Sequence, residues 1–298
     1  MLGPMPASAV APRPVHIFSV DVEEHFQVSA FERSVPRSTW DQHESRVERN
    51  TKVLLELLGR AGARGTFFTL GWVAERQPSL IKEIAKAGHE LASHGWWHYR
   101  VHTQTPEQFR QEIRSSKAIL EDLTGEPVTG FRAPSFSIVP GTEWAFDVLI
   151  EEGYRFDSSL FPIRRPGYGY PRAPRSVHRI DRPSGSLVEF PMATWSVLGM
   201  RVPAAGGGYL RQFPLSVIRG AFRQSAGRAQ PGMFYVHPWE VDPAQPRMAI
   251  GPVTRFRHYR GLEQCRRRLE ILLAELSFCT ARDWLAERGG MVQVGTTV

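Results

Sequence analysis

The chain has 298 residues, 42% of them hydrophobic, so it is long enough to bury a sizeable core as one large domain or two small ones. Its net charge of +7 is diffuse and forms no basic cluster with interleaved aromatic residues, which argues against a nucleic-acid-binding protein. Two cysteines without CxxC spacing argue against a thiolate metal site or a redox pair, and the lack of about 18 consecutive apolar residues argues against a transmembrane helix.

The first residues of the sequence differ from a secretory signal. They have neither a basic n-region nor a continuous apolar h-region, because the stretch is interrupted by Pro4, Pro6, Pro12 and Pro14. We expect residues 1–14 to form a flexible leader and the protein to stay in the cytoplasm, with an association with the periplasm as the alternative.

After this leader, short apolar runs alternate with amphipathic stretches. The apolar, β-branched and aromatic runs predict strands at residues 15–20, 65–71, 89–94, 128–136, 154–159 and 232–240. The amphipathic stretches predict helices at residues 44–62, 78–88, 105–125, 142–153 and 261–278. Strands that alternate with helices are typical of a parallel sheet or barrel of the α/β class.

The clearest helix signals surround residues 105–125. Thr105 is suited to be the N-cap, Pro106 stands at the first helical position, and Gln108 completes a capping box. Gly125 follows the last predicted turn and is suited to end the helix.

Residues 15–298 are predicted to form a single domain with one irregular insertion. Residues from about 164 to 230 are rich in proline, glycine and arginine and contain one clear strand candidate, residues 186–193. A helical segment at about 261–288 completes the chain.

Polar side chains collect where the predicted strands end. In a parallel α/β architecture, active residues gather at the C-terminal ends of the strands, because the loops there vary while the sheet fixes their bases. The candidates at these positions are Asp21, Glu23, His94, Arg132, Asp157 and His237.

Two histidines four residues apart predict a metal site. His94 and His98 can converge on one cation if the segment between them turns helical, and neutral imidazoles suit zinc, cobalt, nickel or iron. Gly95 stands where the metalloprotease motif HExxH needs its glutamate, so that class is excluded. Asp21 and Glu23 share one face of a strand, so one carboxylate can complete the ligand set while the other acts as general base. A packed, hydrogen-bonded histidine pair is the alternative.

These motifs, in this order, resemble the polysaccharide deacetylase family, also called NodB-like carbohydrate esterases. The matching stretches are "SVDVEE", "SHGWWH", "FRAPSF", "FDSSLF" and "YVH". The resemblance covers residues 18–284 and implies a distorted parallel (β/α) barrel with extra C-terminal elements. It also implies metal-dependent removal of acetyl groups from the N-acetylated sugars of a polysaccharide or oligosaccharide.

The motif variants are most similar to one branch of that family. Together with "GGGY" at residues 206–209, they resemble the deacetylases associated with bacterial exopolysaccharide and exosortase (PEP-CTERM) loci. This resemblance implies an exopolysaccharide as the substrate.

The family resemblance implies catalytic roles for five residues. Asp21 would be the general base, Arg132 would orient it, and His237 would be the general acid. The backbone N–H of Ser135 would help to hold the oxyanion. Asp157 would hydrogen-bond to His237, although an aspartate that begins the turn "DSS" is equally a capping residue.

The resemblance also implies the metal ligands. Glu23, His94 and His98 would bind a divalent ion, with zinc expected first and cobalt or nickel as alternatives. The common family pattern has two adjacent aspartates, whereas here the second acid is a glutamate one residue further on. Either Glu23 or Glu24 could therefore reach the metal, and strand geometry favours Glu23.

Three tryptophans lie close in sequence to these candidates. Trp96, Trp97 and Trp239 could offer flat faces to sugar rings, although large aromatic side chains also dominate protein cores. Two other functions remain open from the sequence: hydrolysis of a small or cyclic amide on the same fold, and glycan binding without catalysis. The sequence does not indicate an oligomeric state.

Overall fold

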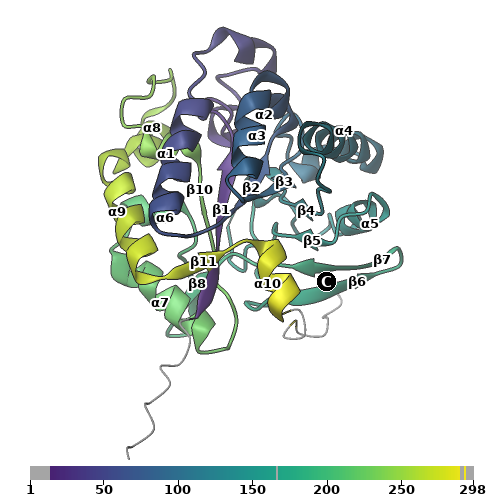
Figure 1. Ribbon diagram of the computed structural model, residues 1–298, viewed down its shortest axis with the longest axis vertical. Coiled ribbons are helices and arrows are strands. Elements are labelled where there is room, and N and C mark those ends of the chain that lie inside the picture. Colours follow the sequence, from purple (N-terminus) through teal and green to yellow (C-terminus); the bar gives the residue numbers. More distant parts are fainter. Residues whose placement is uncertain (1–13, 166, 289–291, 293–298) are drawn as a thin grey trace, which may run out of the picture.

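The computed structural model describes residues 14–165, 167–288 and 292, so the predicted leader lies outside the described residues except for Pro14. The described chain forms an α/β fold with a mainly parallel sheet flanked by helices (Figure 1). The sheet has nine strands: β1 (Val15–Val22), β2 (Thr66–Thr69), β3 (Glu90–Ser93), β4 (Gly130–Phe131), β5 (Phe156–Asp157), β6 (His178–Arg182), β7 (Gly185–Glu189), β10 (Met233–Val236) and β11 (Ser277–Cys279).

The strand order is that of a distorted barrel. Neighbouring strands follow the order β10-β1-β2-β3-β4-β5-β7-β6, with β11 paired to β1, and every pair except β6–β7 is parallel. Beyond β7, Met192 forms a single parallel bridge to Met233 of β10, so the sheet returns to its first strand through one bridge. The predicted fold class is confirmed.

The sheet is buried on both faces. Seven of the eight residues of β1 and all four residues of β2 are buried, as expected for parallel barrel strands whose outer face is covered by helices and whose inner face packs in the core. The helices are α1 (Val47–Arg60), α2 (Gly71–Arg76), α3 (Pro78–Lys86), α4 (Pro106–Thr124), α5 (Trp144–Glu151), α6 (Gly207–Gln212), α7 (Leu215–Ala226), α8 (Pro252–Tyr259), α9 (Leu262–Glu275) and α10 (Ala281–Arg288). Within the described ranges, none of them combines the length and the apolarity that a membrane span requires.

Helix α4 begins and ends as its sequence predicts. The side chain of Thr105 accepts a hydrogen bond from the backbone N–H of Gln108, and the Gln108 side chain accepts one from the backbone N–H of Thr105. Gly125 ends the helix with a φ of 71°, in the left-handed region that glycine adopts at low cost.

Replacing Thr105 by alanine should lower the free energy of unfolding by about 1 kcal/mol, because one helix N–H then loses its acceptor. Thr105→Ser, which keeps the hydroxyl, is the control. Urea denaturation followed by circular dichroism measures both, and an alanine variant as stable as the serine variant would contradict the capping role.

The segment around 164–230 is more regular than predicted. Besides the expected strand, now β7, it contains β6, the hairpin of β8 (Thr194–Val197) and β9 (Met200–Pro203), and helices α6 and α7. The predicted C-terminal helical segment is likewise interrupted by β11, which pairs with β1. These strands are short, and β6 alternates buried with exposed residues, so no long apolar run reveals them.

Candidate metal centre and active site

The C-terminal ends of four strands bring the predicted polar residues together. Asp21 lies on β1 with Glu23 directly after it, His94 follows β3, Arg132 follows β4, and His237 follows β10. Asp21, Glu23, His94, His98 and His237 all line one cavity of about 700 Å³.

Three buried side chains form a metal-binding arrangement. One ligand atom from each of Glu23, His94 and His98 lies within 4.8 Å of the others. Oε2 of Glu23 is 2.9 Å from Nε2 of His98. Nδ1 of His94 is 2.8 Å from the backbone oxygen of Arg132, and a hydrogen bond donated there leaves the lone pair on Nε2 of His94.

The protonation of these groups suits a cation. Burial lowers the pKa of His94 to about 4, so its imidazole is neutral at pH 7. Burial alone would raise the pKa of Glu23, but the neighbouring imidazoles of His98, His237 and His94 lower it to about 2, so Glu23 is a carboxylate.

A buried carboxylate oxygen without a hydrogen-bond partner also lies at this predicted metal site. Oε2 of Glu23 is buried and accepts no hydrogen bond from any described residue, because the nearby ring of His98 does not meet hydrogen-bond geometry. A buried carboxylate oxygen without a partner is costly. Two imidazoles and one carboxylate are one of the ligand sets found in catalytic zinc sites, so the residues fit a divalent metal.

The loop that carries the two histidines is not helical, which corrects the prediction. Gly95 has a φ of 77° and His98 a φ of 54°, so the chain turns back on itself between them. The carboxylate of Glu112 accepts hydrogen bonds from the backbone N–H groups of Trp96 and Trp97, at 3.1 and 3.0 Å, and fixes the turn. A tight turn anchored on α4 therefore brings the imidazoles together.

Asp21 is held by a buried arginine. Nη1 of Arg132 lies 2.5 Å from Oδ1 of Asp21 and 2.9 Å from Oγ of Ser19. The guanidinium also donates to the backbone oxygen and hydroxyl of Ser158, so its plane is fixed. Arg132 is fully buried, and Asp21 therefore has a defined orientation at the base of the cavity.

His237 lies on the other side of the two carboxylates. Its Nε2 is 3.5 Å from Oε1 of Glu23 and 3.9 Å from Oδ2 of Asp21, and its Nδ1 is 3.3 Å from Oε2 of Glu240. Burial would lower the pKa of His237, but Glu23, Glu240 and Asp21 together raise it to about 9. The imidazole therefore carries a proton at neutral pH.

Comparison with known proteins finds the family that the sequence motifs resemble. Residues 32–145 match the family "polysaccharide deacetylase", and residues 158–286 match a domain of unknown function, DUF3473. This part of the chain is therefore similar to polysaccharide deacetylases.

Curated relatives agree with this family over part of their length. The chain is 31% identical over 128 residues to a peptidoglycan deacetylase of Helicobacter pylori, which covers 43% of this chain and 42% of the relative. It is 31% identical over 105 residues to a peptidoglycan-N-acetylglucosamine deacetylase of Bacillus cereus, covering 35% and 47% respectively. The chain thus spans less than half the length of these relatives.

A solved structure shares the whole fold. The crystal structure of a putative polysaccharide deacetylase from Mycobacterium smegmatis superposes with a TM-score of 0.59 at 19% identity, covering 99% of this chain and 98% of that one. The architecture seen here is therefore that of the polysaccharide deacetylase fold.

The two adjacent glutamates that could reach the metal, Glu23 and Glu24, have different surroundings. Glu24 accepts hydrogen bonds from the hydroxyl of Ser45 at 2.5 Å and from the backbone N–H groups of Arg46 and Val47 at 3.0 and 3.2 Å. It therefore anchors the start of α1, and Glu23 is the carboxylate that faces the two imidazoles.

Asp157 does not occupy the position that the family resemblance predicts for it. Its carboxylate accepts hydrogen bonds from the N–H and hydroxyl of Ser159, at 2.9 and 2.6 Å, and it pairs across the sheet with Glu189 of β7. Among the described residues the carboxylate at Nδ1 of His237 is Glu240. Asp157 therefore fits the capping alternative, because its side chain turns back along its own loop.

Glu240 was missed by the sequence analysis. It lies three residues after His237 in the 3-10 helix η5 (Pro238–Val241), and its Oε2 also accepts a hydrogen bond from the backbone N–H of His237 at 3.1 Å. Nε of Arg211 is 3.0 Å from its other oxygen. An acid three residues after a strand-end histidine is the signal that could have revealed it.

The tryptophans are mostly packing residues, which corrects the predicted sugar contacts. The ring of Trp96 covers Gly71, and Trp97 packs at 6.0 Å from Trp40, so neither lines the cavity. Trp239 does line it, but it is only 5% exposed. The aromatic side chains that also face the cavity are Phe136, Tyr168, Tyr209, Phe213 and Tyr235.

Trp239 supports the metal site from behind. Its ring stacks between the rings of His237 and His258, with centroid distances of 4.9 and 4.2 Å, and its Nε1 donates a hydrogen bond to Oε1 of Glu23 at 3.2 Å.

Ser135, the predicted oxyanion donor, lines the cavity with a φ of 55°, a left-handed conformation that is rare for serine.

The "GGGY" motif is a close-approach segment. A Cβ on Gly207 would lie 1.8 Å from Oε2 of Glu240, and one on Gly206 would lie 2.5 Å from the ring of Tyr235. A Cβ on Gly208 would meet only a guanidinium nitrogen at 3.9 Å. The first two glycines therefore let α6 pack directly against the residues behind His237.

Replacing Gly207 by alanine should lower the free energy of unfolding by about 1–3 kcal/mol, because the new methyl group overlaps a buried carboxylate. Gly208→Ala, in the same helix, should cause no loss, since alanine has the higher helix propensity. Urea denaturation compares the two variants. Equal stability of both would show that the segment shifts freely.

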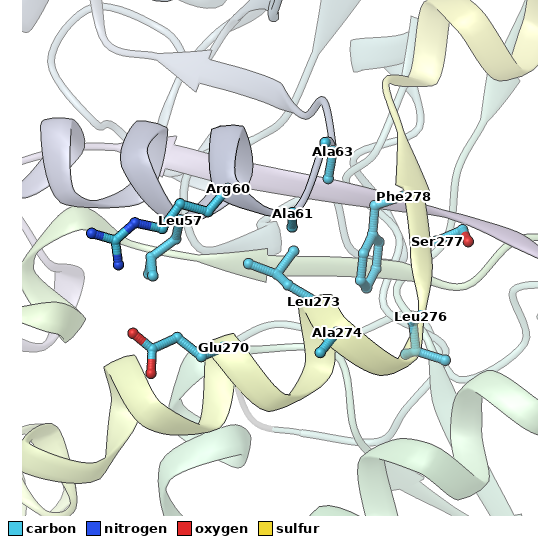
Figure 2. A pocket seen from close by; sticks show the side chains of 11 residues that line it. Leu57, Arg60, Ala61, Ala63, Glu270, Leu273, Ala274, Leu276, Ser277 and Phe278 are labelled. Atoms are coloured by element: carbon cyan, nitrogen blue, oxygen red, sulfur yellow. The ribbon is translucent and has the colours of Figure 1, made fainter.

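A second pocket, of about 460 Å³, lies between the end of α1 and the junction of α9 with β11 (Figure 2). Its charged lining residues are Arg60 and Glu270. Because β11 pairs with the first residues of β1, this pocket lies at the opposite end of the strands from Asp21.

Proposed function

We propose that the protein is a metal-dependent N-deacetylase that removes acetyl groups from amino sugars of a bacterial exopolysaccharide. The observation that carries the proposal is the buried triad of Glu23, His94 and His98 beside the Asp21–Arg132 pair, at the base of one cavity. Relatives named as peptidoglycan deacetylases support an N-acetylated glycan, and the motif variants favour an exopolysaccharide.

The residues have complementary roles in amide hydrolysis. A divalent metal held by Glu23, His94 and His98 would polarise the amide carbonyl and lower the pKa of a water molecule. Asp21, oriented by Arg132, takes the proton from the attacking water. His237, which is protonated at neutral pH, gives a proton to the departing amine.

The oxyanion needs a donor near the same point. Ser135 lines the cavity, so its backbone N–H can face the carbonyl oxygen as it becomes negative during the attack of water. Acetate and a free amino sugar are the products. The cavity of about 700 Å³ and its aromatic lining suit sugar rings, whereas a small or cyclic amide would leave much of it to water.

Acetate release from N-acetylglucosamine oligomers by the zinc-loaded protein tests the proposal. Chelation should abolish the release, and added zinc, cobalt or nickel should restore it. Release of acetate with formation of one amine per acetate supports N-deacetylation. Failure to act on these oligomers or on an N-acetylated exopolysaccharide, while small amides are hydrolysed, would replace the proposal by the amidase alternative.

Glu240→Gln should move the alkaline limb of the kcat/KM profile to lower pH. Only protonated His237 can act as an acid, so activity is lost as the pH rises through its pKa, and Glu240 is one of the charges that raise this pKa. Glu240→Asp, which keeps the charge, is the control. An alkaline limb that stays in place in the glutamine variant would exclude His237 as the acid.

A further inference from the structure

The charged residues that line the cavity are unevenly distributed. Four arginines line it, and two of them have carboxylate partners: Arg100 with Glu32, and Arg211 with Glu240. These two are therefore neutralised within the protein.

The other two lining arginines are not neutralised. Arg165, in the loop after β5, and Arg257, on α8, are both exposed, and neither has a carboxylate partner among the described residues. The carboxylates that line the cavity are Asp21 and Glu23, which are buried: Asp21 pairs with Arg132, and Glu23 faces the histidines of the metal site. The mouth of the cavity is thus positive, while its acids lie at the base.

We propose that the protein binds an anionic N-acetylated glycan, whose carboxylate is recognised by Arg165 and Arg257 while the acetylated sugar enters the cavity. This inference rests on the proposed function. Guanidinium groups match carboxylates in geometry and charge, and unpaired cations around a cleft attract an anionic ligand over several ångströms.

Both arginines are positive and exposed, so they attract an anionic glycan to this cavity and give a neutral glycan no such attraction. A carboxylate can come from a lactyl group on an acetylated sugar or from a uronic acid in the chain, and the same two arginines would bind either.

Binding to matched oligosaccharides tests the inference without catalysis. Full-length Asp21→Asn protein, loaded with zinc, is titrated calorimetrically with an N-acetylglucosamine–N-acetylmuramic acid tetrasaccharide and with its methyl ester. A second arm uses a hyaluronan tetrasaccharide and its methyl ester. We expect each acid to bind about tenfold more tightly than its ester, since two exposed ion pairs contribute about that much, and the preference to weaken with salt.

The arginines are tested by a double substitution. Arg165→Ala with Arg257→Ala should bring the ratio of the ester and acid dissociation constants close to one, while Arg165→Lys with Arg257→Lys should keep most of the preference. Arg223→Ala removes another exposed charge, on α7 outside the cavity, and should leave the ratio unchanged.

The outcomes separate this inference from the proposed function. Equal binding of acid and ester in both arms, or no binding of any of the four, would overturn it even if neutral oligomers release acetate. A preference for the acid in either arm supports it and identifies the source of the carboxylate. A protein that prefers the acids but releases no acetate from any of these glycans would keep this inference and defeat the deacetylase proposal.

Discussion

Replacement of His94 by alanine is expected to abolish both zinc binding and acetate release. Its side chain is one of three ligands, and its tautomer is set by the backbone oxygen of Arg132. Losing a partner outside the ligand set typically costs about 10–100-fold in metal affinity or activity, and losing a ligand itself should cost more. Zinc content after dialysis and acetate release are measured on the same preparation.

His102→Ala is the matched control for this substitution. His102 follows the same strand as His94 but is exposed and lies outside the cavity. Its loss should leave both readouts at the wild-type level. Retention of zinc or of acetate release by the His94 variant would defeat the assigned ligand set.

Asp21→Asn is expected to lower acetate release by about 10²–10⁴-fold while zinc binding is retained. The amide cannot accept the proton of the attacking water, and Asp21 is not among the three clustered ligand residues. Zinc content therefore separates loss of the base from loss of the metal. A variant that loses zinc would make Asp21 a ligand, and one that keeps full activity would exclude it as the base.

The parts of this site that could be predicted are those that short sequence stretches encode. Asp21 and Glu23 share a strand face by alternation, and the histidines lie four residues apart, so both pairs were recognisable before any tertiary structure. Helix α4 was similarly defined by Thr105 and its capping box. Parallel strands then place all their C-terminal ends at one edge, which brings these pairs together.

The parts that could not be predicted depend on contacts between distant segments. Whether Asp157 or Glu240 faces His237 depends on how β5 and β10 are placed around the barrel. Arg211, which holds Glu240, comes from a segment where proline and glycine obscure the helical pattern. The sequence did not show whether the side chains of Trp96 and Trp97 point into the cavity, because the left-handed turn at Gly95 decides their direction.

The pairing of β1 also has a consequence for biosynthesis. Ile17 pairs with Met233 on one side and with Cys279 on the other, so the edge of β1 that faces β10 and the first three residues of the opposite edge wait for residues late in the chain, whereas β2 pairs early with Ser19–Val22. All three ligand residues have left the ribosome long before either partner is made. A nascent chain can therefore assemble the ligands around an unpaired strand edge, which is prone to aggregate, and only β10 and β11 remove that hazard. Refolding should accordingly be slow, since the contacts that complete the barrel are among the most distant in sequence.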